Sequence, residues 1–184
     1  MRVDPRPKEA EYLARVGALN GFGRIPDLLS RIHQGGWAYG QPPLMVVDFK
    51  SNEPDWDLSQ RVKAQRYILG ASLDAHPLEL VADQVNQIGA VTSLEAMTRP
   101  DDNLVLAGIR QTTQRFFAHD GEPFYILELE DMEGVLQVMM SPSFYRQHRV
   151  VMSSSEPFAV EGKMVVSSTT GELVLQAQRI FPIR

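Results

Sequence analysis

The sequence contains no cysteine, and this absence excludes several kinds of chemistry at once. Without a thiol there is no disulfide, no thiolate zinc site and no cysteine nucleophile. Low-complexity tracts and repeats at a fixed period are missing as well. The chain of 184 residues has a length typical of one globular domain with an additional arm.

Long hydrophobic runs are also missing. No apolar stretch approaches the roughly 18 residues that a membrane-spanning helix needs. The N-terminal residues lack the apolar core of a signal peptide. Together with the lack of cysteine, these features lead us to expect no membrane contact and a cytoplasmic location.

Positive charge is scarce. The 18 Lys and Arg residues face 23 Asp and Glu residues, which gives a net charge of −5. This balance argues against a protein that coats nucleic acid through a broad basic face. A groove of local positive charge remains compatible with it.

The first region of the chain, residues 1–36, has the pattern of a helical segment. Apolar residues recur at helical spacing within 8–34 in two short runs, and Pro26 stands near the start of the second. Gly35 and Gly36 then end the pattern. We expect two short helices here.

The second region, residues 37–102, predicts a loop followed by a helical linker. Its glycine- and proline-rich start excludes a long helix. Asp57 or Ser59 is expected to cap the next helix, and Pro77 to begin a further one. The polar stretch 99–103 is the clearest break before the third region.

The third region, residues 103–184, is predicted to be the main domain. Apolar and polar residues alternate in five runs, with a helical run between the third and the fourth. The predicted strands are 104–116, 123–131, 135–141, 157–168 and 172–181, and the predicted helix is 142–152.

This order of elements is that of the OB-fold, a small Greek-key barrel. We therefore predict a mainly β fold, a five-stranded OB-fold barrel with an α-helical N-terminal arm. Gly108 inside the first strand predicts a bend or bulge there. The prediction depends on a β-hairpin at 124–140.

Several short motifs occur in a characteristic order. The first is Leu-Gly followed by His-Pro-Leu, the second is Leu-Glu-Asp followed by Gly, and a third group lies downstream. Their residues are Leu69, Gly70, His76, Pro77 and Leu78, then Leu129, Glu130, Asp131 and Gly134, then Pro142, Tyr145, Pro157, Val160 and Gly162.

This series resembles the C-terminal region of the bacterial DNA polymerase III alpha subunit family, including its error-prone paralogues. Residues 13–29 also resemble the end of the family's helix-hairpin-helix region. The resemblance covers most of residues 13–184 and implies an OB domain that follows a helical linker.

Two departures from the family pattern matter. The polymerase core with its palm aspartates is absent from this chain, so the resemblance does not imply nucleotidyl transfer, and we expect no enzyme activity from the chain alone. The family's basic loop between the first two OB strands corresponds here to residues 114–123, where Asp120 and Glu122 oppose Arg115. The chain is a fragment of a longer polymerase or a stand-alone relative; the initial methionine favours the latter.

The ionisable residues predict no active site and no bound cofactor or metal. The four histidines lie far apart in sequence, and none has metal-ligand spacing with another ligand. Glu128 and Glu130 are predicted to share a solvent-exposed strand face rather than a magnesium site.

Nucleic-acid binding is the better prospect. OB domains hold single strands on the face of strands two and three, where bases stack on aromatic rings and cations contact phosphates. Aromatic and cationic residues on or near these elements are the predicted site: Arg110, Arg115, Phe116, Phe117, Tyr125, Lys163 and Arg179.

Some of these residues have a structural alternative. A straight strand would bury one of Phe116 and Phe117 in the barrel. Arg110 and Arg115 would face opposite ways unless a bulge lies between them. We favour Arg115 as the phosphate contact, with an ion pair to Asp120 or Glu122 as the alternative role.

We therefore predict a non-catalytic, single-stranded nucleic-acid-binding accessory module in DNA replication or repair. Residues 103–184 hold seven Lys and Arg and nine Asp and Glu, so binding to single-stranded DNA should be weak and salt-sensitive. The alternative is a protein-interaction module that tethers to a DNA polymerase or a repair complex without binding DNA. A basic stripe across strands two and three would favour DNA, and an apolar patch would favour a partner.

Overall fold

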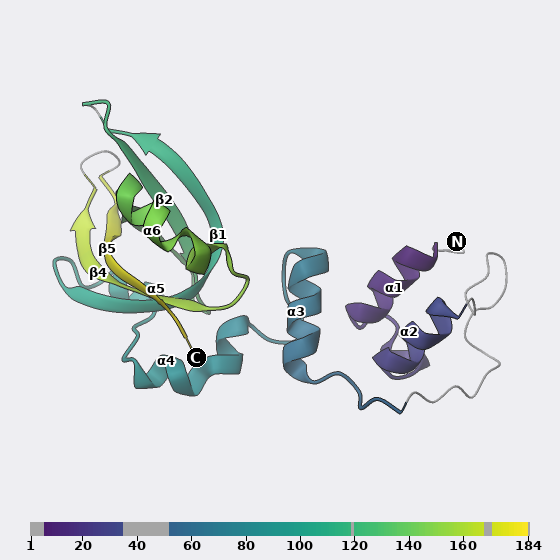
Figure 1. Ribbon diagram of the computed structural model, residues 1–184. Helices are drawn as coiled ribbons and strands as arrows, with labels where there is room; N and C mark the ends of the chain where they lie inside the picture. Colours follow the sequence, from purple (N-terminus) through teal and green to yellow (C-terminus); the bar gives the residue numbers. More distant parts are fainter. Residues whose placement is uncertain (1–5, 35–51, 119, 168–170, 184) are drawn as a thin grey trace. The chain divides into compact units, whose positions relative to one another are not determined.

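The computed structural model describes residues 6–34, 52–118, 120–167 and 171–183 (Figure 1). The chain divides into two compact units, Met1–His76 and Pro77–Arg184. The first part of the predicted linker, 37–51, lies outside the described residues. Each unit is described by itself.

The first unit is helical. Its helices α1 and α2 pack against each other through small and branched apolar residues, which are Ala10, Ala14, Leu28 and Ile32. The two short helices predicted within 8–34 are therefore present. The elements of this unit are α1 (Pro7–Arg15), the 3-10 helix η1 (Asn20–Phe22), α2 (Ile25–His33) and α3 (Leu58–Leu69).

Helix α3 begins at a reciprocal cap. Asp57 Oδ1 accepts a hydrogen bond from Gln60 N at 2.8 Å, and Gln60 Oε1 accepts one from Asp57 N at 2.9 Å. Asp57, and not Ser59, is therefore the cap. The helix ends at Gly70, whose φ of 77° is a left-handed conformation that favours glycine.

A buried glutamine ties α3 to its surroundings. Gln65 is only 1% exposed. Its Nε2 donates to the Val16 carbonyl at 3.2 Å, and its Oε1 accepts from the backbone N–H groups of Leu73 and Asp74 at 2.8 and 3.2 Å. Because its amide is hydrogen-bonded on both sides, this polar side chain can be buried without an unpaired group.

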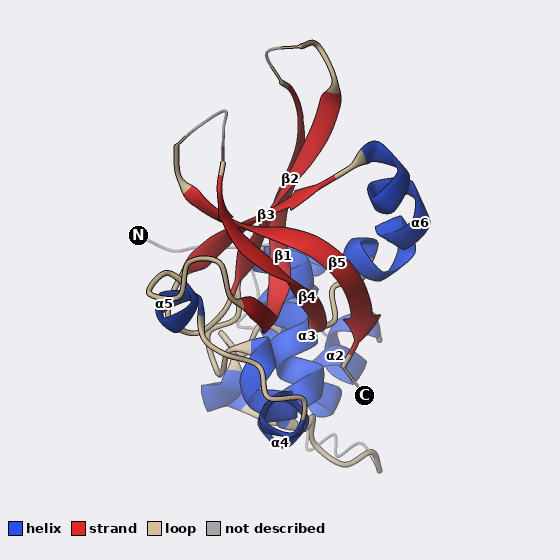
Figure 2. Ribbon diagram, turned by 90° about the vertical axis from the view of Figure 1, so that its left-hand side faces the viewer, coloured by secondary structure: helices blue, strands red, loops and turns tan. Residues whose placement is uncertain are grey.

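The second unit contains a closed five-stranded barrel in the order β1-β2-β3-β5-β4 (Figures 1 and 2). Only the β3–β5 pair is parallel. This is the strand order of the OB-fold, so the predicted fold is confirmed. The strands are β1 (Asn103–Phe117), β2 (Pro123–Glu130), β3 (Val135–Met140), β4 (Phe158–Val166) and β5 (Leu173–Pro182).

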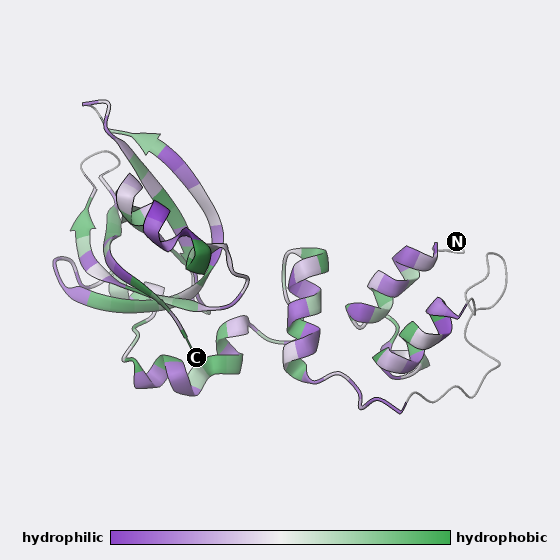
Figure 3. Ribbon diagram, viewed as in Figure 1, coloured by the Kyte–Doolittle hydropathy of each residue, from purple (hydrophilic) through white to green (hydrophobic). Residues whose placement is uncertain are grey.

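The hairpin on which the prediction depended is present. Tyr125 pairs with Met140 and Glu130 with Val135 in one antiparallel register. Along the strands, hydrophobic and hydrophilic positions follow one another (Figure 3). The inward positions form the core, with Leu106, Leu127 and Phe158 each at most 2% exposed.

Helix α6 (Pro142–Ser153) connects β3 to β4. Ser141 caps it, because its Oγ accepts a hydrogen bond from Phe144 N at 3.2 Å. Met152 and the partly buried Tyr145 pack against the barrel core. The helix therefore covers part of the barrel interior, as the OB-fold order predicts.

Residues 77–102, which precede β1, belong to the same unit as the strands. They form η2 (Pro77–Val81), α4 (Ala82–Gln87) and α5 (Ser93–Ala96), the last of which the sequence did not predict. Val91 N donates to the Val105 carbonyl at 2.9 Å. Because 77–102 pairs with the barrel in this way, the compact unit starts at Pro77, whereas the predicted OB domain starts at 103.

Strand β1 is irregular in the middle. The register against β2 shifts between Arg110 and Thr112, two residues beyond the bend predicted at Gly108. Gly108 has a different role. A Cβ there would lie 2.6 Å from the Glu130 carbonyl oxygen, so the two backbones approach more closely than any side chain permits.

Candidate nucleic-acid interface

A groove of about 230 Å³ lies on the outer face of β1, β2 and β3. Residues directly opposite each other in an antiparallel pair share a face of the sheet. Phe116 lies opposite Phe124, Gln114 opposite Ile126, and Thr112 opposite Glu128. These six residues and Gln137 of β3 line the groove.

Two phenylalanines form the aromatic part of the groove. The rings of Phe116 and Phe124 are stacked, with their centroids 5.8 Å apart and an interplanar angle of 24°. Phe116 is 42% exposed and can receive a further ring on its open side.

The expectation that only one of Phe116 and Phe117 would be exposed was wrong. Phe117 is 59% exposed, although it lies on the opposite face of β1 from Phe116. The far ends of β1 and β2 project beyond the rest of the barrel (Figure 2), so neither of their faces is covered there by the core.

Tyr125 is placed away from the groove. Its ring stacks on Tyr145 of α6, with a centroid separation of 4.1 Å and an angle of 11°. One face of its ring is therefore covered by Tyr145. Phe124 replaces Tyr125 in the groove, and the sequence contained the signal: Glu128 was expected to face solvent, and alternation puts Phe124 on the same face.

The shift in β1 decides how the two predicted arginines lie. Arg110 is opposite Leu129 and Arg115 is opposite Tyr125, two residues that share a face of β2. The extra residue thus brings both arginines to one side of the sheet, and this is the side opposite the groove, because Phe124 and Ile126 of the groove lie on the other face of β2. The Arg115 guanidinium lies over the Phe117 ring at 4.9 Å, and in the described part of the turn it forms no ion pair with Asp120 or Glu122.

Lys163 and Arg179 lie on another part of the barrel. Their strands, β4 and β5, pair with each other, and β4 has no contact with β2 or β3 in the strand order. Lys163 Nζ pairs with Asp101 at 3.1 Å, and Arg179 pairs with Glu161 at 3.7 Å. The structure does not bring these two cations to the groove.

The groove face carries negative charge. Strands β2 and β3 are described throughout and contain no lysine or arginine, whereas Glu128 and Glu130 lie on the groove side of β2. The Glu130 carboxylate accepts a hydrogen bond from the Gln111 amide. Arg110 and Arg115 lie on the other face of the sheet, and neither is among the residues that line the groove.

The residues that the structure describes contain no group of three or more His, Asp or Glu side chains placed to hold a metal ion. None of the described helices is long and apolar enough to cross a membrane.

No family model matches the chain. Relatives match it along nearly its whole length, however. An error-prone DNA polymerase of Cutibacterium acnes is 30% identical over 97% of this chain and 16% of its own length. An error-prone DNA polymerase of Corynebacterium efficiens is 27% identical over 99% of this chain and 17% of its own length.

The DNA polymerase III subunit alpha of Saccharopolyspora erythraea is 26% identical over 93% of this chain and 14% of its own length. The chain is related to the C-terminal region of bacterial DNA polymerase III alpha subunits. The resemblance inferred from the motifs is thereby confirmed. The chain spans about one sixth of the length of the error-prone polymerases that it matches.

Several solved structures resemble about half of the chain at low sequence identity. An SSB domain from Synechococcus shares 14% identity, covers 43% of this chain and 92% of its own, and has a TM-score of 0.33. Asparaginyl-tRNA synthetase from Pyrococcus horikoshii shares 18% identity, covers 53% of this chain and 23% of its own, and has a TM-score of 0.40. The assignment of this chain to the OB-fold rests on the order of its own strands.

Proposed function

We propose that this polymerase III alpha relative is a non-catalytic module that binds single-stranded nucleic acid in DNA replication or repair in the cytoplasm. The observation that supports this most is the exposed Phe116 ring, stacked on Phe124 in a groove on the strand face that OB domains use for single strands.

In this proposal stacking supplies most of the affinity. A base on the open side of Phe116 contributes about 1–3 kcal/mol. Ile126 provides an apolar floor beside it. Arg110 and Arg115 lie on the opposite sheet face, so a strand in the groove meets them only with phosphates that pass around the sheet, and two such contacts give a slope of log affinity against log salt of only about −1.4. Binding is therefore weak.

A protein partner is the second candidate. The groove combines an apolar floor with Glu128, Glu130 lies on the same face of β2, and the basic stripe that would favour DNA is missing from β2 and β3. Such a surface fits a peptide with apolar and basic residues, which a polymerase or a repair protein would supply.

Fluorescence anisotropy with a short labelled single strand, at low and moderate salt, tests the first candidate. Phe116→Ala should weaken binding by at least fivefold. The matched control is Val166→Ala, which removes an exposed apolar side chain of β4 and should leave binding unchanged. Equal binding by both variants would exclude a stacking role for the groove.

Glu128→Gln separates the two candidates. Removal of a negative charge from the groove should tighten binding of a phosphate-bearing strand and weaken binding of a basic peptide. Unchanged affinity for the labelled strand would mean that the strand does not pass over the groove.

A further inference from the structure

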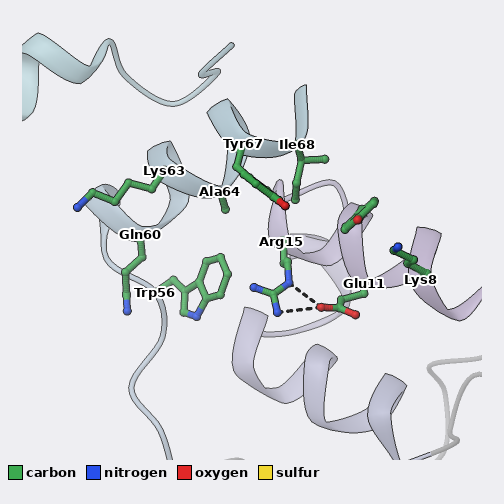
Figure 4. Close-up of a pocket in the computed structure, with 10 residues that line it drawn as sticks. Lys8, Glu11, Arg15, Trp56, Gln60, Lys63, Ala64, Tyr67 and Ile68 are labelled. Atoms are coloured by element: carbon green, nitrogen blue, oxygen red, sulfur yellow. Dashed lines mark hydrogen bonds and ion pairs between the residues drawn. The ribbon is translucent and has the colours of Figure 1, made fainter. Parts of the chain in front are cut away.

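The helical unit contains a second pocket, far larger than the groove on the barrel. Its volume is about 660 Å³, within the range of small-molecule sites, and it lies between α1 and α3 with Trp56 just before α3 (Figure 4). The argument depends on six of its residues: Lys8, Glu11, Arg15, Trp56, Lys63 and Tyr67.

The aromatic rings of this pocket are available to a ligand. Tyr67 is 86% exposed, although it lies in the middle of the second half of α3. A ring so exposed adds nothing to the packing of the unit. Trp56 is half-buried, and Figure 4 shows its ring beneath α3, between Ala64 and Arg15. Tyr12 of α1 also lines the pocket and is 37% exposed.

Positive charge surrounds these rings. Lys8, Arg15 and Lys63 line the pocket, against the single acid Glu11. Arg15 Nη2 lies 2.8 Å from Glu11 Oε1. Burial raises the pKa of Glu11, but the hydrogen bonds from Arg15 and His33 outweigh burial and hold the pKa of this carboxyl below its usual range. Glu11 is therefore ionised at neutral pH, and the lining keeps an excess of two positive charges.

Cations and rings are also adjacent to one another. Lys8 Nζ lies 5.8 Å from the centroid of the Tyr12 ring, and Arg15 Cζ lies 5.7 Å from the centroid of the Trp56 ring. A ligand with a flat ring and an anionic group, held a few ångströms apart, would meet both partners at once. A nucleotide has this chemistry.

We propose that this pocket binds one unpaired nucleotide of a nucleic-acid strand, with its base on Tyr67, within reach of Trp56, and its phosphate near Lys8 and Arg15. The site lies in the other compact unit from the barrel groove. It goes beyond the proposed function and does not depend on it.

Tryptophan fluorescence can test this site in the full chain. Both tryptophans, Trp37 and Trp56, belong to the first unit, and residues 77–184 contain none. In a Trp37→Phe background, the signal comes from Trp56 alone. Adding an oligothymidylate should quench it in a saturable way, whether or not the barrel binds.

Tyr67→Ala should weaken this quenching isotherm by about tenfold, the loss expected for one stacked base. Phe22→Ala is the matched control, because it removes another exposed ring of the same unit. Its isotherm should not change. Lys8→Gln should reduce the slope of log affinity against log salt by about 0.7, because it removes one phosphate contact to a single strand.

Three results would overturn the proposal: no quenching by the oligothymidylate, an isotherm that Tyr67→Ala leaves unchanged, or quenching by thymidine monophosphate at the same affinity as the strand. The last would identify a free mononucleotide site instead. Anisotropy that Phe116→Ala leaves unchanged, together with intact Trp56 quenching, would exclude the barrel function alone. Absence of Trp56 quenching, together with anisotropy that depends on Phe116, would exclude only the helical site.

Discussion

The two compact units differ in charge as much as in fold. Residues 1–76 carry ten Lys and Arg and nine Asp and Glu, a net of +1. Residues 77–184 carry eight and fourteen, a net of −6. The negative charge of the chain is therefore concentrated in the unit with the OB barrel.

This difference changes what each unit can do with a polyanion. The barrel offers an open aromatic pair next to glutamates, so affinity there has to come from stacking. The helical unit offers rings and excess cations in one pocket. The net charge of −5 does not show this difference, because it is the sum over both units.

The largest loss of stability is expected for a substitution at a close backbone contact inside the barrel. At Gly162, the first residue after a register shift in β4, an added Cβ would overlap the Gln176 carbonyl. Gly162→Ala should destabilise the barrel by about 2–3 kcal/mol, because two backbones must separate. Circular dichroism of the strands should show earlier unfolding in denaturant, and the Trp56 signal of the helical unit should not move.

Gly134→Ala is the control for this variant. A Cβ there would meet only Ser93 Oγ at 3.4 Å, an ordinary contact. A loss of stability as large as that of Gly162→Ala would show that the loss comes from glycine replacement in general.

The next effect tests the connection of α5 to the barrel. Asp131 Oδ2 accepts from Ser93 N at 2.5 Å, and its Oδ1 accepts from Ser93 Oγ at 2.8 Å and from Glu133 N and Gly134 N at 2.8 and 2.9 Å. Asp131→Ala leaves these donors without their acceptor and should cost the second unit about 2 kcal/mol.

Hydrogen exchange would measure this loss locally, at the amides of Ser93 and Gly134. Asp120→Ala, which removes a carboxylate with one turn hydrogen bond at 3.0 Å, should change stability by less than about 0.5 kcal/mol. Equal effects of the two variants would contradict a special role for Asp131.

Arg115→Ala addresses the electrostatic part of barrel binding. It should reduce the salt slope of single-strand affinity by about 0.7 and leave the thermal midpoint nearly unchanged, because the Arg115 guanidinium lies over the exposed Phe117 ring rather than in the core. Arg179→Ala, on β5, is the matched control and should alter neither quantity. An unchanged slope in Arg115→Ala would place the strand away from this hairpin.

The smallest effect concerns Glu11 and pH. Since its pKa is lowered on folding, the ionised carboxylate stabilises the helical unit above its ordinary pKa of 4.5, and this stability is lost as the pH falls through the lower, folded value. Glu11→Gln should cost about 0.5 kcal/mol at neutral pH and nothing in strong acid. Thermal unfolding followed by Trp56 fluorescence at both pH values measures it.

The strands were predictable because alternation, turns and the position of one helix agree with each other. The groove was predictable only in part. Phe116 lines the groove, whereas Tyr125 was named and Phe124 was not, although alternation from Glu128, which was expected to face solvent, places Phe124 on the groove face. The bulge after Arg110 has no distinctive residue, so its position could not be inferred from Gly108.

The pocket of the helical unit could not be predicted. Trp56 and Arg15 are 41 positions apart, and only the packing of α1 and α3 brings them together. Short helices were recognised from their apolar spacing, but that pattern describes the buried side and gives no information on which exposed rings converge.

Chemical-shift mapping of the isotope-labelled full chain with a short single strand tests the central claim most directly. The account predicts saturable shifts at the amides of Phe116, Phe124 and Ile126, with Lys163 and Arg179 unaffected. Shifts that leave Phe116 and Phe124 unchanged at saturating strand would contradict the claim that the outer face of β1, β2 and β3 binds nucleic acid.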